Sequence, residues 1–320
     1  RDRTFNDVVY DRVERVPGAF FEYTYGGHEK FSMVAGLRSD HHNAYGFFLT
    51  PRLHIRYGFN DQLVGRISLG RGQRTANVLA EQNGIMASAR RFLIDGEGSD
   101  KPYGLDPEVA WNAGANLVYT FQVNQQTGSF SLDFYRTIFQ NQMVVDLDVS
   151  PQEVYFYNLV GKSYSNSFQA QLDYELLPRF DTRVAYRWYD VKTTYRQGLL
   201  ARPMVSRHRL FLNLAYATES GWDFDWTINW QGRKRLPGTA SNPVAYQLDE
   251  YSPDFVVMNA QVTKKWNAFE VYMGVENLLN FRQDQPILAS EDPFGTYFDS
   301  SLTWGPIFGR NTYLGLRYRI

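Results

Sequence analysis

The chain has 320 residues, with 33 basic and 34 acidic side chains and a formal net charge of -1. This balance lacks the excess of basic residues typical of nucleic-acid-binding proteins, so nucleic acid is not an expected partner. The absence of cysteine excludes disulfide frameworks, zinc-thiolate sites and cysteine nucleophiles. Mean hydropathy is -0.43 and no apolar run approaches the length of a membrane-spanning helix.

Alternation of apolar and polar residues predicts about thirteen β-strands, and most of them approach the roughly 9 to 11 residues that a tilted strand needs to cross a bilayer. The first seven are predicted at Ala19–Tyr25, Phe31–Arg38, Pro51–Phe59, Leu63–Gly70, Glu108–Gln122, Phe130–Phe139 and Val154–Leu176, the last interrupted near Gly161. The other six are predicted at Phe180–Lys192, Arg207–Thr218, Gly221–Gln231, Phe255–Lys265, Phe269–Asn277 and Arg310–Ile320.

The connections between these strands alternate between short and long. Tight turns are expected near residues 26–29, 58–61, 124–128, 178–179, 219–221 and 265–267. Long excursions are expected at 39–50, 71–107, 140–153, 193–206, 232–254 and 278–309. Because outer-membrane barrels have short periplasmic turns and longer extracellular loops, this sorting predicts an all-β fold, an antiparallel transmembrane β-barrel.

One predicted strand shows the two faces of such a wall most clearly. Between Gly221 and Gly232, Trp222, Trp226 and Trp230 alternate with polar residues. A soluble barrel would bury the aromatic face, whereas a membrane barrel turns it to lipid and keeps the polar face around its lumen. Other candidate lumen residues are Ser131, Asp133, Gln169, Gln171, Asp173, Glu175, Arg183, Arg187, Asp223, Asp225 and Asn229.

Four short motifs, in order along the chain, resemble those of TonB-dependent outer-membrane receptors. The segments Gly70–Asn77 and Asp106–Glu108 are similar to elements around a large external loop, and Gly274–Asn280 is similar to the signature of the penultimate strand. Gly305–Arg310 and the closing strand follow at a similar distance. The positions that carry the last two motifs are Gly274, Glu276, Asn277, Leu278, Gly305, Pro306, Gly309 and Arg310.

This resemblance implies a barrel of about 22 strands with a plugged lumen, of which residues 1–320 would be the C-terminal portion. The N-terminal plug domain and its TonB-contacting segment would lie outside this chain, so we expect it to be a fragment. The implied function is import of a scarce chelated nutrient, such as a ferric siderophore, haem or cobalamin, across the Gram-negative outer membrane. Implied partners are outer-membrane lipid, the ligand, the TonB–ExbB–ExbD complex through the plug, and a surface lipoprotein.

Two alternatives remain open on the sequence. A passive porin would share the strand pattern and the loops but should lack the paired C-terminal motifs. A structural or adhesive barrel could keep the motifs without transport. In none of these cases is an enzyme expected, and neither a cofactor nor a metal site is predicted.

The predicted loop after Gly70 contains four arginines that could surround a ligand. Arg71, Arg74, Arg90 and Arg91, with Asn77, would form a cationic mouth suited to an anionic chelate. The alternative is that these arginines pair with nearby carboxylates or with lipid phosphate, as surface arginines commonly do.

Histidines and aromatic residues in other loops are further candidates for ligand contact. His41 and His42 precede Tyr45, but neighbours on an extended chain point apart, so a shared metal ion is disfavoured and solvated histidines are expected. Trp304 belongs to a set of loop aromatics that could clamp a ligand or pack on one another.

Two closely spaced acid pairs have calcium-like or catalytic spacing. Asp146 and Asp148 lie in a predicted loop, and Asp223 and Asp225 share the polar face of one strand. A lumen-facing polar strand explains the second pair without chemistry, and no supporting nucleophile or base is found. No catalytic residue is therefore predicted.

Overall fold

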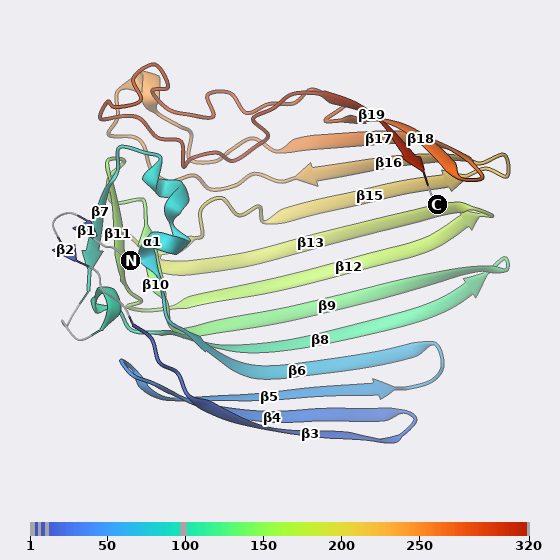
Figure 1. The fold of residues 1–320 in the computed structure, drawn as a ribbon, viewed down its shortest axis with the longest axis horizontal. Helices are drawn as coiled ribbons and strands as arrows, with labels where there is room; N and C mark the ends of the chain where they lie inside the picture. The colour runs from blue at the N-terminus through green and yellow to red at the C-terminus, as the bar shows by residue number, and fades with distance from the viewer. Residues whose placement is uncertain (1–3, 6–7, 10–12, 97–100, 319–320) are drawn as a thin grey trace.

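The computed structural model describes residues 4–5, 8–9, 13–96 and 101–318. Its main sheet contains fourteen strands. Thirteen are joined side by side in chain order, every neighbour antiparallel, as Figure 1 shows. They are β3 (Gly18–His28), β4 (Phe31–His42), β5 (Gly46–Gly58), β6 (Leu63–Arg74), β8 (Glu108–Val123), β9 (Gln126–Asn141), β12 (Ser163–Leu177), β13 (Phe180–Tyr195), β15 (His208–Ala217), β16 (Trp222–Gln231), β17 (Phe255–Trp266), β18 (Phe269–Glu276) and β19 (Asn311–Tyr318). The fourteenth, β14 (Gly198–Ala201), pairs with β13.

The thirteen predicted strands are confirmed, with one correction. The segment predicted as Val154–Leu176 is two strands, β11 (Glu153–Asn158) and β12, which belong to different sheets. The break lies near Gly161, as predicted. Gly161 has φ +120°, and a Cβ there would lie 2.8 Å from Thr194 Oγ1, so the strand does not continue through this position. Ile320, the predicted end of the last strand, lies outside the described residues.

Long and short connections gather at opposite ends of the sheet, as Figure 1 shows. The excursion predicted at 39–50 is wrong, because β4 continues to His42 and β5 begins at Gly46. Gly46, with φ +74°, allows the tight turn. The His41 and Phe47 rings then pair across the strands with centroids 4.9 Å apart, a kind of contact that stabilises neighbouring strands.

The strand register gives the sheet one apolar and one polar face. On β16, Trp230, Ile228 and Trp226 lie opposite Leu210, Leu212 and Leu214 of β15. The residues that alternate with them on β16, Asp225 and Thr227, lie on the polar face, opposite Ala215 and Asn213 of β15. Near the short turns, the apolar face carries an aromatic band typical of a membrane interface, formed by Tyr57, Tyr119, Phe121, Tyr174, Phe180, Tyr216, Trp222, Trp266, Phe269 and Tyr318.

A layer of long connections covers the other end of the sheet. It contains a small sheet in the order β10 (Met143–Asp146), β11 and β7 (Arg91–Asp95). The layer has its own apolar core, in which Val78, Val154 and Phe156 are completely buried. The remaining elements are β1 (Thr4–Phe5), β2 (Val8–Val9), α1 (Val78–Glu81) and the 3-10 turns η1 (Asn83–Met86), η2 (Pro102–Gly104) and η3 (Val244–Tyr246). None of the helices among the described residues has the length and apolar character of a membrane-spanning helix.

Candidate functional site

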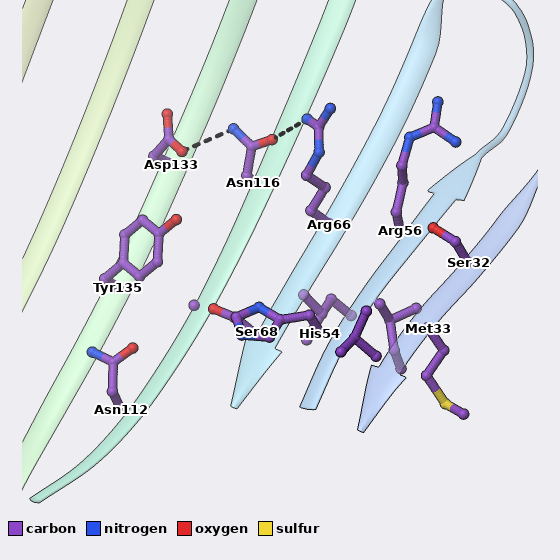
Figure 2. A pocket seen from close by; sticks show the side chains of 14 residues that line it. Ser32, Met33, His54, Arg56, Arg66, Ser68, Asn112, Asn116, Asp133 and Tyr135 are labelled. Atoms are coloured by element: carbon purple, nitrogen blue, oxygen red, sulfur yellow. Dashed lines mark hydrogen bonds between the residues drawn. The ribbon is translucent and has the colours of Figure 1, made fainter. Parts of the chain in front are cut away.

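A large cleft lies on the polar face, across β4, β5, β6, β8 and β9. Its volume is about 610 Å³. Figure 2 shows its side chains projecting from neighbouring strands of the main sheet. The polar side chains that line it include His54, Arg56, Arg66, Asn116, Asp133 and Tyr135.

A chain of hydrogen bonds fixes one half of this polar-face cleft. Arg66 Nη1 donates to Asn116 Oδ1 at 2.9 Å, and Asn116 Nδ2 donates to Asp133 Oδ1 at 2.8 Å (Figure 2). The ring of Tyr135 lies over Gly114, where a Cβ would come within 2.3 Å of the ring carbons. Only glycine therefore leaves room for this aromatic wall.

The cleft carries more positive than negative charge. Arg56 lies directly opposite Arg66 in the register of β5 and β6. Like charges in this arrangement destabilise a strand pair unless an anion screens them. Among the ion pairs of the described residues, none includes Arg56 or Arg66. The cleft can thus bind a polar, anionic group.

A second cationic cluster lies on the polar face of β13 and β15. Arg187 and Arg209 are opposite each other in the register. Their guanidinium carbons lie 5.7 and 5.6 Å from the centre of the Tyr189 ring. Arg187 Nε donates to Gln169 Oε1 at 2.7 Å, so this guanidinium is held by neutral partners, and its charge stays available to an anion.

The structure does not bring the four candidate arginines together into one mouth. Arg71 lies on the apolar face in register with Trp111, and its Nη1 donates to the Leu49 carbonyl at 2.6 Å. Arg74 lies on the opposite face and pairs with Glu108 and Glu81.

Arg90 and Arg91 differ although they are neighbours. The side chain of Arg90 is 1% exposed and its Nε donates to Asp299 Oδ2 at 2.7 Å. Arg90 Nη1 also donates to the carbonyls of Ser150 and Glu153, both at 3.1 Å. Arg91 is 72% exposed and pairs with Glu153 at the surface. Arg90 therefore holds loops together, and direct ligand contact by these arginines stays a prediction.

His41 and His42 point to opposite faces, as expected for neighbours on a strand. His42 is buried, contrary to the expectation of a solvated histidine, because it packs against Tyr45 and Phe48 at centroid distances of 4.8 and 5.8 Å. The Tyr45 hydroxyl donates to the Leu105 carbonyl at 3.1 Å. No cluster of three or more potential metal ligands occurs among the described residues.

Asn77 and Trp304 both have structural contacts within the loop layer. Asn77 caps α1, its Oδ1 accepting from the Ala80 amide at 3.2 Å. Trp304 is mostly buried with Leu236 and Phe255, and Lys234 donates to its carbonyl. Burial, together with the charge of Arg209, lowers the pKa of Lys234.

The acid pair Asp146 and Asp148 ties loops together. Asp148 accepts two hydrogen bonds from Arg235, each 2.9 Å long. Buried Asp146 accepts from the Tyr157 hydroxyl at 2.7 Å. Burial and this hydrogen bond raise the pKa of Tyr157, so its hydroxyl remains a donor. The second pair, Asp223 and Asp225, lies on the polar face as predicted.

The two C-terminal motifs lie against each other in space. The Asn277 side chain donates to the carbonyls of Phe281 and Phe308, and Arg310 Nη2 donates to the Leu278 carbonyl at 2.7 Å. A residue between the motifs completes the contact: Gln283 Oε1 accepts from the amides of Trp304 and Gly305 at 2.7 and 2.9 Å.

Close packing explains most of the remaining motif positions. A Cβ at Gly274 would lie 2.3 Å from the Tyr313 ring, and one at Gly309 would lie 2.4 Å from Asn280 Oδ1. The Pro306 carbonyl accepts from the Gln283 amide at 2.8 Å, while Glu276 accepts from Asn311 Nδ2 at 3.3 Å.

Four residues of these sites were not singled out from the sequence: Gln283, Arg56, Arg66 and Asn116. For Arg56, Arg66 and Asn116, the signal that was available is the alternation of polar and apolar residues along their strands.

Comparisons with known proteins agree with this architecture. Residues 2–278 match the family model described as TonB dependent receptor-like, beta-barrel. No curated protein sequence matches the chain significantly.

Several solved structures have a similar fold at low sequence identity. A mutant ferric enterobactin receptor (PfeA) from Pseudomonas aeruginosa in complex with enterobactin gives a TM-score of 0.70 at 15% identity. The copper transporter OprC gives 0.68 at 16%, and the siderophore receptor PirA from Acinetobacter baumannii gives 0.64 at 17%. Each alignment covers 95% of this chain but only 45%, 48% and 46%, respectively, of the other.

Proposed function

Because the chain belongs to the family of TonB-dependent receptor-like β-barrels, we propose that it forms part of the wall of an outer-membrane importer. Members of this family are transporters and not enzymes. Residues 1–320 would be the C-terminal part of the barrel domain, with the plug and its TonB contact in another part of the polypeptide. The observation that carries the proposal is the sorting of side chains into one apolar and one polar face along β16, within a sheet whose long loops share one end.

The proposed ligand is a scarce anionic metal chelate, for example a ferric siderophore. Its support lies on the polar face, where Arg56 and Arg66, and then Arg187 and Arg209, face each other without a carboxylate pair among the described residues. Haem and cobalamin remain within the proposed class of large nutrients. Guanidinium groups bind carboxylates and other oxyanions through charge-assisted hydrogen bonds.

Uptake by living cells tests this proposal. A strain that lacks the gene should lose uptake of a radiolabelled ferric chelate, and a strain that lacks TonB should lose it equally. Replacing Arg56 and Arg66 with glutamine should reduce uptake by at least about tenfold, since each charge-assisted hydrogen bond contributes about 1.5–3 kcal/mol.

A matched control is Arg38→Gln, since Arg38 is already paired with Asp40 at 2.7 Å. This control should change uptake little. Uptake that persists without TonB would identify a passive channel. If deletion of the gene leaves the uptake of every tested nutrient unchanged, the proposal that the protein is an importer is wrong.

A further inference from the structure

The apolar face carries unexpected positive charge near its long-loop end. Arg136 projects from β9 on the same face as Phe134 and Ile138, which are 43% and 46% exposed. The next row of side chains on this face, toward the long loops, runs continuously across β6, β8, β9, β12 and β13. It consists of Arg71, Trp111, Ile138, Tyr164 and Lys192. In a membrane barrel this face meets lipid.

The position of Arg136 corresponds to the outer edge of the membrane. It lies ten residues along β9 from Gln126 at the short-turn end. With a rise of about 3.4 Å per residue and a tilt of about 40°, that distance spans roughly the 25 Å height of the apolar band. The guanidinium therefore lies at the level of the headgroups in the outer leaflet.

These arginines have neutral contacts. The Arg136 guanidinium carbon lies 5.7 Å from the centre of the Tyr164 ring, and Arg71 donates to the Leu49 carbonyl. Neither belongs to an ion pair in the described part of the chain. Asp190, a carboxylate on this face, already contacts Lys192 at 3.9 Å and Asn166 at 3.5 Å.

We propose that Arg71 and Arg136, with Lys192, form a binding site for the phosphate groups of an anionic outer-leaflet lipid. A charged side chain beside hydrocarbon is costly unless an opposite charge accompanies it. At this edge of the membrane, lipid phosphate is the abundant anion, and the adjacent Trp111 and Tyr164 suit the interface. This site is on the opposite face from the proposed transport path and does not depend on it.

The test measures lipid affinity by native mass spectrometry on the receptor as encoded by its whole gene, purified in detergent. The probes are bisphosphorylated lipid A, the same lipid without phosphates, and inorganic phosphate. We expect the phosphorylated lipid to bind at least about tenfold more tightly than the dephosphorylated one, and inorganic phosphate not to compete.

Substitutions assign the site to particular residues. The double variant Arg71→Gln, Arg136→Gln should bind the phosphorylated lipid at least about tenfold more weakly, because each basic residue at a lipid surface contributes roughly fivefold to affinity. Arg136→Lys should retain most of the affinity because the charge remains.

The matched control is Lys264→Gln, which removes a cation from the same face at the short-turn end, where Lys264 lies 5.0 Å from the Trp222 ring centre. It should leave the affinity unchanged. Equal affinity for the two lipids, or equal losses in the control and the double variant, would overturn the proposal. If the double variant fails to fold, the comparison of the two lipids and the Arg136→Lys variant still decide the outcome.

Discussion

Ile228→Arg is expected to reduce the stability of the membrane-inserted barrel by about 2–4 kcal/mol, the usual cost of a basic residue near the middle of the lipid-facing band. Ile228 lies on the apolar face between Leu212 and Met258. The measurement is urea unfolding of the receptor from lipid bilayers, compared with wild type.

The neighbouring substitution Thr227→Arg is the control. Thr227 lies on the polar face between Asn213 and Asn259, so the new charge should be solvated and change stability by no more than about 0.5 kcal/mol. A larger loss at position 227 than at position 228 would assign the two faces in the opposite sense.

Arg90→Ala is expected to loosen the whole loop layer. The substitution leaves the buried Asp299 carboxylate without its cation and removes hydrogen bonds to the Ser150 and Glu153 carbonyls. Removing one partner of a buried ion pair typically costs about 3–5 kcal/mol. Hydrogen exchange should accelerate at loop amides, such as the Ala89 amide bonded to the Phe298 carbonyl at 2.8 Å, while the strands of the main sheet remain protected.

Arg91→Ala provides the comparison, because Arg91 is exposed and its pair with Glu153 lies at the surface. Exposed ion pairs contribute about 0–1 kcal/mol, so loop exchange should be almost unchanged. Equal exchange in the two variants would show that Arg90 does not hold the layer together.

The sequence predicted the main sheet well because each strand contains its own signal. Alternating residues such as Trp226, Thr227 and Ile228 must project to opposite faces whatever the rest of the chain does. The alternation of short turns with long loops then indicated an antiparallel membrane barrel. The exception is residues 39–50, where His41 and His42 interrupt the apolar pattern although the pairing of β4 with β5 continues to His42 and Gly46.

The loop layer could not be predicted in the same way. Arg90 and Asp299 are 209 residues apart in the chain, and Asp148 and Arg235 are 87 apart, so nothing local marks them as partners. Without a structure, the arginines near the loop looked alike. Their surroundings separate them into Arg71 on the apolar face, Arg74 and Arg91 in ion pairs with carboxylates, and Arg90 in the buried centre of the layer.

The lipid-facing position of the aromatic face is tested most directly with cysteine substitutions, because residues 1–320 contain no cysteine. Single cysteines are placed in turn along β16, from Asp223 to Asn229, and labelled in intact outer membranes with a water-soluble maleimide and with a lipid-partitioning one. We expect positions 223, 225, 227 and 229 to react with the water-soluble reagent and positions 224, 226 and 228 to react with the lipid-partitioning one. The reverse alternation, or no alternation at all, would contradict the claim that the aromatic face meets lipid and the polar face encloses the passage.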